Sequence, residues 1–180
     1  VEANTASTLR TVVVGGTLSD NGLAGNINNV TVISTQSSIV ETYFAGVSVD
    51  NSTLNGMSYD VGLGSVLLSQ IRGGVSASNN VNGSGVQFIA RDAFTQGVLY
   101  MEGANTFDNN GTAVVGTNVS PQAGAGVFFD ANGVAVAGIR FAGGASNNGN
   151  PAPPPATGNP FADVDGDGDN YHDSYLRRSA

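Results

Sequence analysis

A small polar cluster built on Asn-Asn or Asp-Asn returns along this sequence and separates short apolar runs. It appears as LSDNGLAGNINN (18–29), ASNNVNGSG (77–85), FDNNGTAVVG (107–116) and ASNNGN (145–150). Asn and Gly tolerate the left-handed backbone conformation that sharp corners require. A chain that turns at the same kind of corner again and again is restricted to folds made of repeated short elements.

The runs between these clusters have the composition of β-strands. Most are four to seven residues long and rich in Val, Ile, Phe and Tyr, as in SVLLSQI (65–71), GVQFIA (85–90) and GVLYME (97–102). β-branched and aromatic residues favour strands, whereas the 26 Gly and 20 Asn of the chain disfavour helices. We therefore expect an all-β protein.

Strand, turn, strand and Asn cluster repeat as a unit of about 20 to 25 residues, with considerable drift. One such unit cannot bury its own apolar side chains, so copies must stack on one another. Stacking places like residues above one another. We expect alternate apolar side chains to form inward columns, and corner Asn side chains to hydrogen-bond from one turn to the next.

This pattern resembles the right-handed parallel β-helix of the pectate-lyase-like superfamily, over residues 9–149 and about six turns. The expected fold is a short parallel β-solenoid, preceded by an N-terminal segment (1–8). The alternative is an antiparallel β-sandwich or jelly roll, which uses similar strands and turns. Recurrence of the same corner residue favours the solenoid.

The composition changes at residue 150. The segment 150–160, NPAPPPATGNP, is expected to be an extended, Pro-rich linker, followed by an acidic tail (161–180). Five Asp residues lie close together within the tail, in DVDGDGDNYHD (163–173). Neighbouring carboxylates repel unless a cation lies among them, and Ca²⁺ prefers six to eight oxygen ligands.

The Asp cluster resembles the Ca²⁺ loops of dockerins, thrombospondin type-3 repeats and VCBS repeats, which implies bound Ca²⁺ here. Two registers fit that resemblance. In the first, the loop begins at Asp163, Gly168 makes the turn, and Ser174 replaces the usual bidentate Glu, which implies weak binding. In the second it begins at Asp165 and Asn170 makes the turn. The expected ligands from both registers are Asp163, Asp165, Asp167, Asp169, Tyr171 through its carbonyl, and Asp173.

Charge and residue usage exclude several function classes. The net charge of −8, with six Arg and no Lys, disfavours nucleic-acid partners, and no apolar run is long enough for a membrane-spanning helix. The body contains no His, Cys or Lys, so nucleophilic triads that need His are excluded there. The few candidate catalytic groups in the body are Arg72, Arg91, Asp92, Asp108, Asp130 and Arg140.

These observations favour a non-catalytic structural or adhesive protein that is extracellular or on a cell surface. Since no capping helix is recognisable, we expect head-to-tail assembly into filaments or a surface layer. A glycan or another cell-surface molecule is a possible partner. The alternative function is a carbohydrate-active β-helix enzyme or glycan-binding module, similar to a polysaccharide lyase.

Overall fold

The computed structural model describes residues 1–21, 27–111, 126–132, 135–142, 145–146 and 175–179. They form strands, turns and loops without a helix. Every pair of neighbouring strands is parallel. The expected parallel β-solenoid is confirmed, and the antiparallel sandwich is excluded.

Two main sheets carry the fold. Sheet A contains, in spatial order, β1 (Glu2–Ala3), β3 (Val30–Ser34), β5 (Met57–Val61), β7 (Val86–Ala90), β10 (Val127–Asn132) and β13 (Tyr175–Ser179). Sheet B contains β2 (Thr8–Val14), β4 (Ile39–Ala45), β6 (Val66–Arg72), β8 (Gln96–Glu102) and β11 (Val136–Ala142). A narrow third side is made by β9 (Asn105–Thr106), β12 (Ala145–Ser146) and single bridges that link Thr17, Ser48, Ser76 and Thr106.

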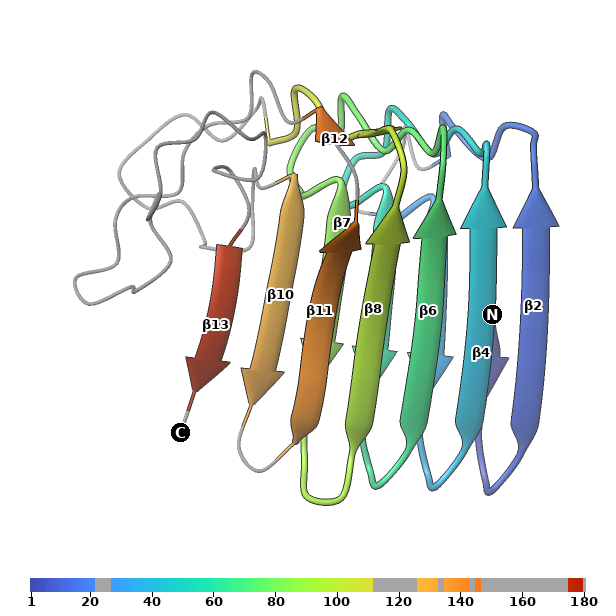
Figure 1. Cartoon of the computed structure of the whole chain (residues 1–180), viewed down its shortest axis with the longest axis vertical. Coiled ribbons are helices and arrows are strands. Elements are labelled where there is room, and N and C mark those ends of the chain that lie inside the picture. The colour runs from blue at the N-terminus through green and yellow to red at the C-terminus, as the bar shows by residue number, and fades with distance from the viewer. Residues whose placement is uncertain (22–26, 112–125, 133–134, 143–144, 147–174, 180) are drawn as a thin grey trace.

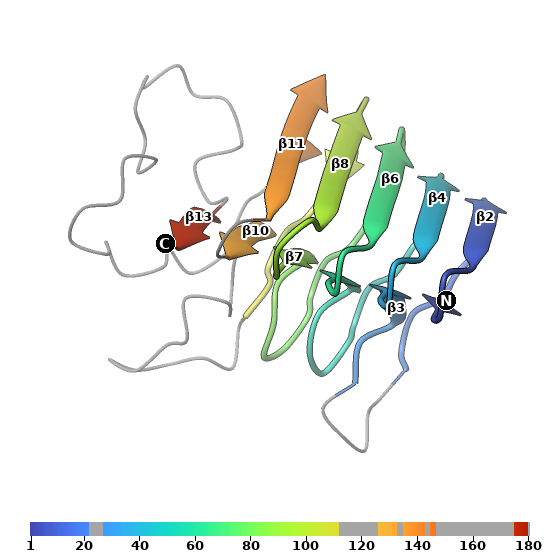
Figure 2. The same cartoon turned by 90° about the horizontal axis from the view of Figure 1, so that it is seen from below.

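The chain alternates between the two sheets as it advances. In Figure 1 it runs up along the sheet B strands in front, crosses to the far side and runs down along sheet A. Each turn lies further from β2, so the winding is right-handed. Figure 2 shows the two sheets edge on, with β2 at one end of the stack and β11 and β13 towards the other.

Each turn is longer than the sequence pattern suggested. Thr8 pairs with Ile39, which pairs with Val66, which pairs with Gln96, so successive turns advance by 31, 27 and 30 residues. The unit of 20 to 25 residues was wrong because it left out the third side of the cross-section. The solenoid accordingly has about three turns through the continuous stretch 27–111, fewer than expected.

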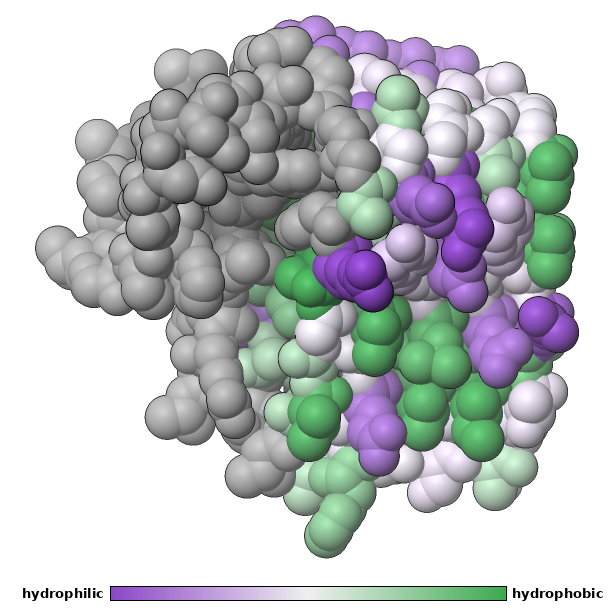
Figure 3. All heavy atoms as spheres, viewed as in Figure 1, coloured by the Kyte–Doolittle hydropathy of each residue, from purple (hydrophilic) through white to green (hydrophobic). Residues whose placement is uncertain are grey.

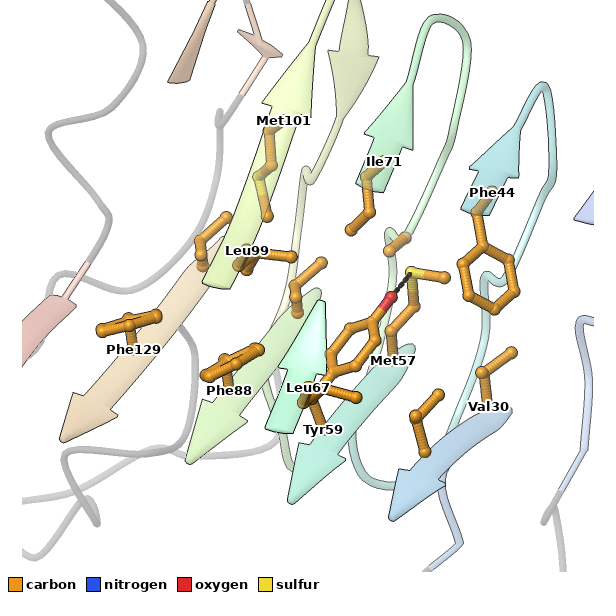
Figure 4. Close-up of a cluster of buried hydrophobic side chains, with 14 of the residues drawn as sticks. Val30, Phe44, Met57, Tyr59, Leu67, Ile71, Phe88, Leu99, Met101 and Phe129 are labelled. Atoms are coloured by element: carbon orange, nitrogen blue, oxygen red, sulfur yellow. Dashed lines mark hydrogen bonds between the residues drawn. The ribbon is translucent and has the colours of Figure 1, made fainter. Parts of the chain in front are cut away.

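The core lies between the sheets and is built from alternate residues, as predicted. In β7 the residues Val86, Phe88 and Ala90 are fully buried, whereas the residues between them are partly exposed. Aromatic rings of neighbouring turns stack in one column: the centroid of Phe88 lies 5.8 Å from that of Tyr59 and 5.0 Å from that of Phe129 (Figure 4). Each large apolar side chain buried in this way contributes about 1.5–3 kcal/mol.

A column of glycines ends sheet B. Gly15, Gly46, Gly73 and Gly103 directly follow the last residues of β2, β4, β6 and β8, and all have positive φ. The amide of Gly46 donates to the carbonyl of Gly73 (3.1 Å), so the ladder of hydrogen bonds continues past the strands. A side chain at such a φ is strained, which explains why Gly recurs at this corner.

The Asn residues occupy a second corner, after the third side. Asn51, Asn79 and Asn109 follow one another from turn to turn and all have φ between 55° and 60°. The next residue of each of these turns is buried, and in two of them it is also Asn. Nδ2 of Asn80 donates to Oδ1 of Asn110 (2.6 Å), and Oδ1 of Asn80 accepts from the amide of Ser52 (3.0 Å). Both expected roles of Asn, corner former and turn-to-turn ladder, are confirmed.

Candidate functional site

The predicted calcium ligands Asp163, Asp165, Asp167, Asp169, Tyr171 and Asp173 lie outside the described residues, as does the linker 150–160. Within the described ranges, no three His, Asp or Glu side chains come together in a way that could hold a metal ion. A search of the same ranges finds no helix long and apolar enough to cross a bilayer.

Several candidate catalytic residues form contacts between turns instead of converging on a site. Nη2 of Arg91 lies 2.6 Å from Oδ2 of Asp60. Asp92 accepts a hydrogen bond from the amide of Leu63 (3.1 Å). Because each contact joins two adjacent turns, these charges bind one turn to the next.

The remaining candidates are divided among different sides. Asp130 is buried in β10 of sheet A, whereas Arg72 and Arg140 lie on sheet B and Asp108 follows the third side. Nη1 of Arg72 pairs with Oε2 of Glu102 on the next turn (3.2 Å). General acid–base or lyase chemistry needs its groups within hydrogen-bond reach of one reacting atom, and these residues are not so arranged.

The outer face of sheet B carries a row of alternating rings and guanidinium groups. Cζ of Arg72 lies 5.9 Å from the ring centroid of Tyr43 and 5.6 Å from that of Tyr100, and Cζ of Arg140 lies 5.5 Å from Tyr100. These four residues come from β4, β6, β8 and β11. The row therefore runs along the solenoid axis, held by cation–π contacts.

An apolar patch lies beside this row. Figure 3 looks onto the same face and shows it below a more polar region. Its exposed members on sheet B are Ile39, Leu68, Val98 and Val136, the last 70% exposed. A shallow groove of about 450 Å³ at the β2 end is lined by Arg10, Glu41, Tyr43 and Gln70, among others. The face thus offers both apolar area and hydrogen-bonding groups.

The two edge strands of sheet B, β2 and β11, have the same length, and both carry partly exposed core side chains. β2 and β11 are both seven residues long and form opposite ends of the sheet, each with a described strand on one side only. Leu9 and Val13 of β2, and Ala137 and Ile139 of β11, pack against the core but stay partly exposed. In the described residues, these are the hydrophobic side chains that the core covers incompletely.

Charge is distributed unevenly along the axis. Residues 1–111 contain eight Asp or Glu against three Arg. The described residues from 126 onwards contain Asp130 against Arg140, Arg177 and Arg178, a net charge of +2. Counted over the full sequence, residues 126–180 also contain the five Asp of 163–173, which makes their net charge −3.

Comparisons with known proteins found no match: no family model, no curated protein and no solved structure is similar to this chain. The site is therefore interpreted from its own geometry.

The residues at the two ends of sheet B were not named from the sequence alone. A repeated segment could have located them. The segments GGTLSDN (15–21), AGVSVDN (45–51), GGVSASN (73–79) and GANTFDN (103–109) coincide with the glycine corner, the third side and the Asn corner. Aligning them gives the true turn length, and hence the strands that stand at the ends. The strand Tyr175–Ser179 carries no such signal, because it follows the Asp cluster and is rich in Arg.

Proposed function

We propose that this protein is a non-catalytic structural or adhesive solenoid that assembles head to tail, outside the cell or on its surface. The observation that carries the proposal is the pair of matched open ends, β2 and β11. An edge strand presents unpaired N–H and C=O groups, which are a template for another strand. A head-to-tail contact does not close on itself, so it produces a filament.

The cross-section of the solenoid supports the same proposal. The turns within residues 27–111 present the same columns of core residues, glycine corners and Asn corners to one another, so stacking one turn on the next is a contact that the solenoid already makes along this stretch. The overall charge of −8 opposes assembly at long range, and salt screens that repulsion over about 10 Å at 0.1 M.

The proposal includes Ca²⁺ bound by the acidic tail (161–180). The resemblance of residues 163–173 to known Ca²⁺ loops supports binding by Asp163, Asp165, Asp167, Asp169, Asp173 and the carbonyl of Tyr171. A bound cation would offset part of the acidic charge that opposes contact between copies. In the sequence, the proposed loop directly precedes the sheet A strand that begins at Tyr175.

Light scattering of the purified chain, with Ca²⁺ and with EDTA, tests the proposed assembly. The proposal predicts masses well above the 18.1 kDa of one chain, rising with protein concentration and with Ca²⁺. A single mass of 18.1 kDa at high concentration in both conditions would contradict it.

The outer face of sheet B favours a second candidate, a glycan-binding module related to the pectate-lyase-like superfamily. Aromatic rings, guanidinium groups and amides on one flat face are the groups that hold a polysaccharide, and the groove beside Tyr43 and Gln70 offers a first subsite. Retardation in gels that contain pectin or alginate tests this candidate. Wild-type protein would be retarded and a Tyr100→Ala variant less so, and equal mobility with and without glycan would exclude it.

A further inference from the structure

The two sheets end at different levels of the stack. At the β11 end, the described residues give sheet A one more strand than sheet B, because β13 pairs with β10 over Phe128–Asn132 and no described sheet B strand accompanies it. At the β2 end the opposite holds. Sheet B begins with a complete strand of seven residues, whereas β1 of sheet A has only two. Among the described residues, one end thus has no sheet B strand beside β13, and the other has only a two-residue sheet A strand beside β2.

β13 at one end of the solenoid lies in register with the sheet A strands at the other end. The pairing registers from β10 through β7 and β5 to β3 place Tyr175 at the position of Thr31, and Arg177 at that of Ile33. Ile33 is the residue that Glu2 of β1 pairs with. β13 therefore covers four of the five register positions of β3, Thr31–Ser34, whereas β1 pairs only with Ile33 and Ser34.

We propose that the joint between two copies is one shared turn, in which β13 of one copy supplies the sheet A strand and β2 of the next copy supplies the sheet B strand. The joint rests on the head-to-tail assembly proposed above. β13 takes the place of β1 against β3 of the next copy, and β2 pairs with β11. The new pairings cover four residues of β3 and seven of β11, and the two-residue pairing of β1 is lost.

The outer columns of sheet B continue through this joint without a clash. In register, Thr8 lies beside Val136, Arg10 beside Gly138, and Val14 beside Ala142. Open space surrounds the Cα of Gly138, where an added Cβ would meet no atom within 4 Å, so the long side chain of Arg10 has room.

The inner columns of sheet B continue as well. Leu9 and Val13 would cover the partly exposed core residues of β11, which include Ala137 and Ile139. Each apolar side chain that the core leaves half-covered at an open end would then be enclosed, as it is in the middle of the solenoid.

Engineered cysteine pairs test the joint cleanly, because the chain contains no Cys. The variant Thr8→Cys with Val136→Cys tests the pairing of β2 with β11, and Thr31→Cys with Tyr175→Cys tests that of β13 with β3. Within one chain each pair is separated by four strand spacings, roughly 19 Å, so only neighbouring copies can form these disulfides. Mild oxidation and a non-reducing gel should show a ladder of multimers for both variants.

Two further variants distinguish the shared turn from other contacts. Thr8→Cys with Arg140→Cys is four residues out of register and should stay monomeric on the gel. The Glu2→Cys, Arg177→Cys pair tests the alternative contact, in which β1 stays paired with β3 and β13 of one copy pairs with β1 of the next. A ladder from that pair, without ladders from the two in-register pairs, would overturn the shared turn while leaving head-to-tail assembly in place. A monomeric mass for the unmodified chain would overturn the assembly itself.

Discussion

Gly97 of β8 faces the ring of Phe88 across the core, and a Cβ at Gly97 would lie 2.8 Å from Cε1 of Phe88. The same ring stacks on Phe129 of the next turn at 5.0 Å with an interplanar angle of 13°. The glycine therefore makes the space that this ring occupies, and the aromatic column depends on it.

Gly97→Ala is expected to lower the free energy of unfolding by about 1–3 kcal/mol, because the added methyl group overpacks the core against Phe88. Gly138→Ala is the matched control: it also lies in a sheet B strand, but in open space. There alanine should leave stability unchanged or raise it by up to about 1 kcal/mol. Urea unfolding followed by circular dichroism measures both, and equal midpoints for the two variants would contradict this packing.

Asn80→Ala should destabilise the protein by about 1–3 kcal/mol, since it leaves the buried amide of Ser52 without the side-chain oxygen it donates to. Asn79→Gly is the control, because Asn79 is exposed with a φ of 58°, which glycine adopts without strain. Thermal unfolding should separate the two variants by several degrees. A similar loss from both would mean that the buried ladder adds nothing beyond corner geometry.

Tyr59 should make the protein sensitive to alkali. Burial raises the pKa of its phenol well above the usual value of about 10, more than hydrogen bonds with Ser69 and Thr42 lower it. Folded Tyr59 keeps its proton above pH 10, whereas unfolded Tyr59 loses it. The contribution of Tyr59 to the free energy of unfolding is therefore fully present below about pH 10. It falls by about 1.4 kcal/mol per pH unit as the pH rises further.

Tyr59→Phe removes that titration and provides the comparison. Urea midpoints measured from pH 8 to 12 should fall more steeply for the wild type than for the variant. The contribution of the other four tyrosines cancels, because both proteins contain them. Parallel curves would show that the Tyr59 hydroxyl is not buried in the core between Met57, Thr42 and Ser69.

Much of this fold could be predicted from the sequence, because the contacts of a solenoid join residues that recur at the same position of each turn. Alternation in VQFIA assigned Phe88 to the core, and the Asn pairs located a corner, since each depends only on near neighbours and on the same position one turn away. Turn length was underestimated because the third side is a single bridge per turn at Thr17, Ser48 and Ser76, too short to register as a strand.

The ends of the molecule were less predictable than its middle. Pairing of Tyr175–Ser179 with β10 joins segments 47 residues apart in register, and no periodicity connects them. Gly97 also could not be assigned, because its role depends on Phe88, which lies in the other sheet. The calcium residues remain a prediction, as the structure does not describe residues 147–174.

Isothermal calorimetry tests the calcium prediction. The wild-type chain should bind Ca²⁺ with a dissociation constant in the micromolar to millimolar range, the range of sites that lack the bidentate Glu. An Asp165→Ala, Asp167→Ala double variant should lose most of the heat, because both residues belong to either register of the loop. Asp108→Asn, which alters an acidic group outside the tail, is the control. Equal heats from the double variant and the wild type would remove the site.

Electron microscopy of the negatively stained chain, at raised protein and Ca²⁺ concentration, tests head-to-tail assembly most directly. Continued stacking of β2 on β11 predicts unbranched filaments of uniform width, no wider than one solenoid, whose length grows with concentration. Separate particles of the size of one 18.1 kDa chain under the same conditions would contradict the account.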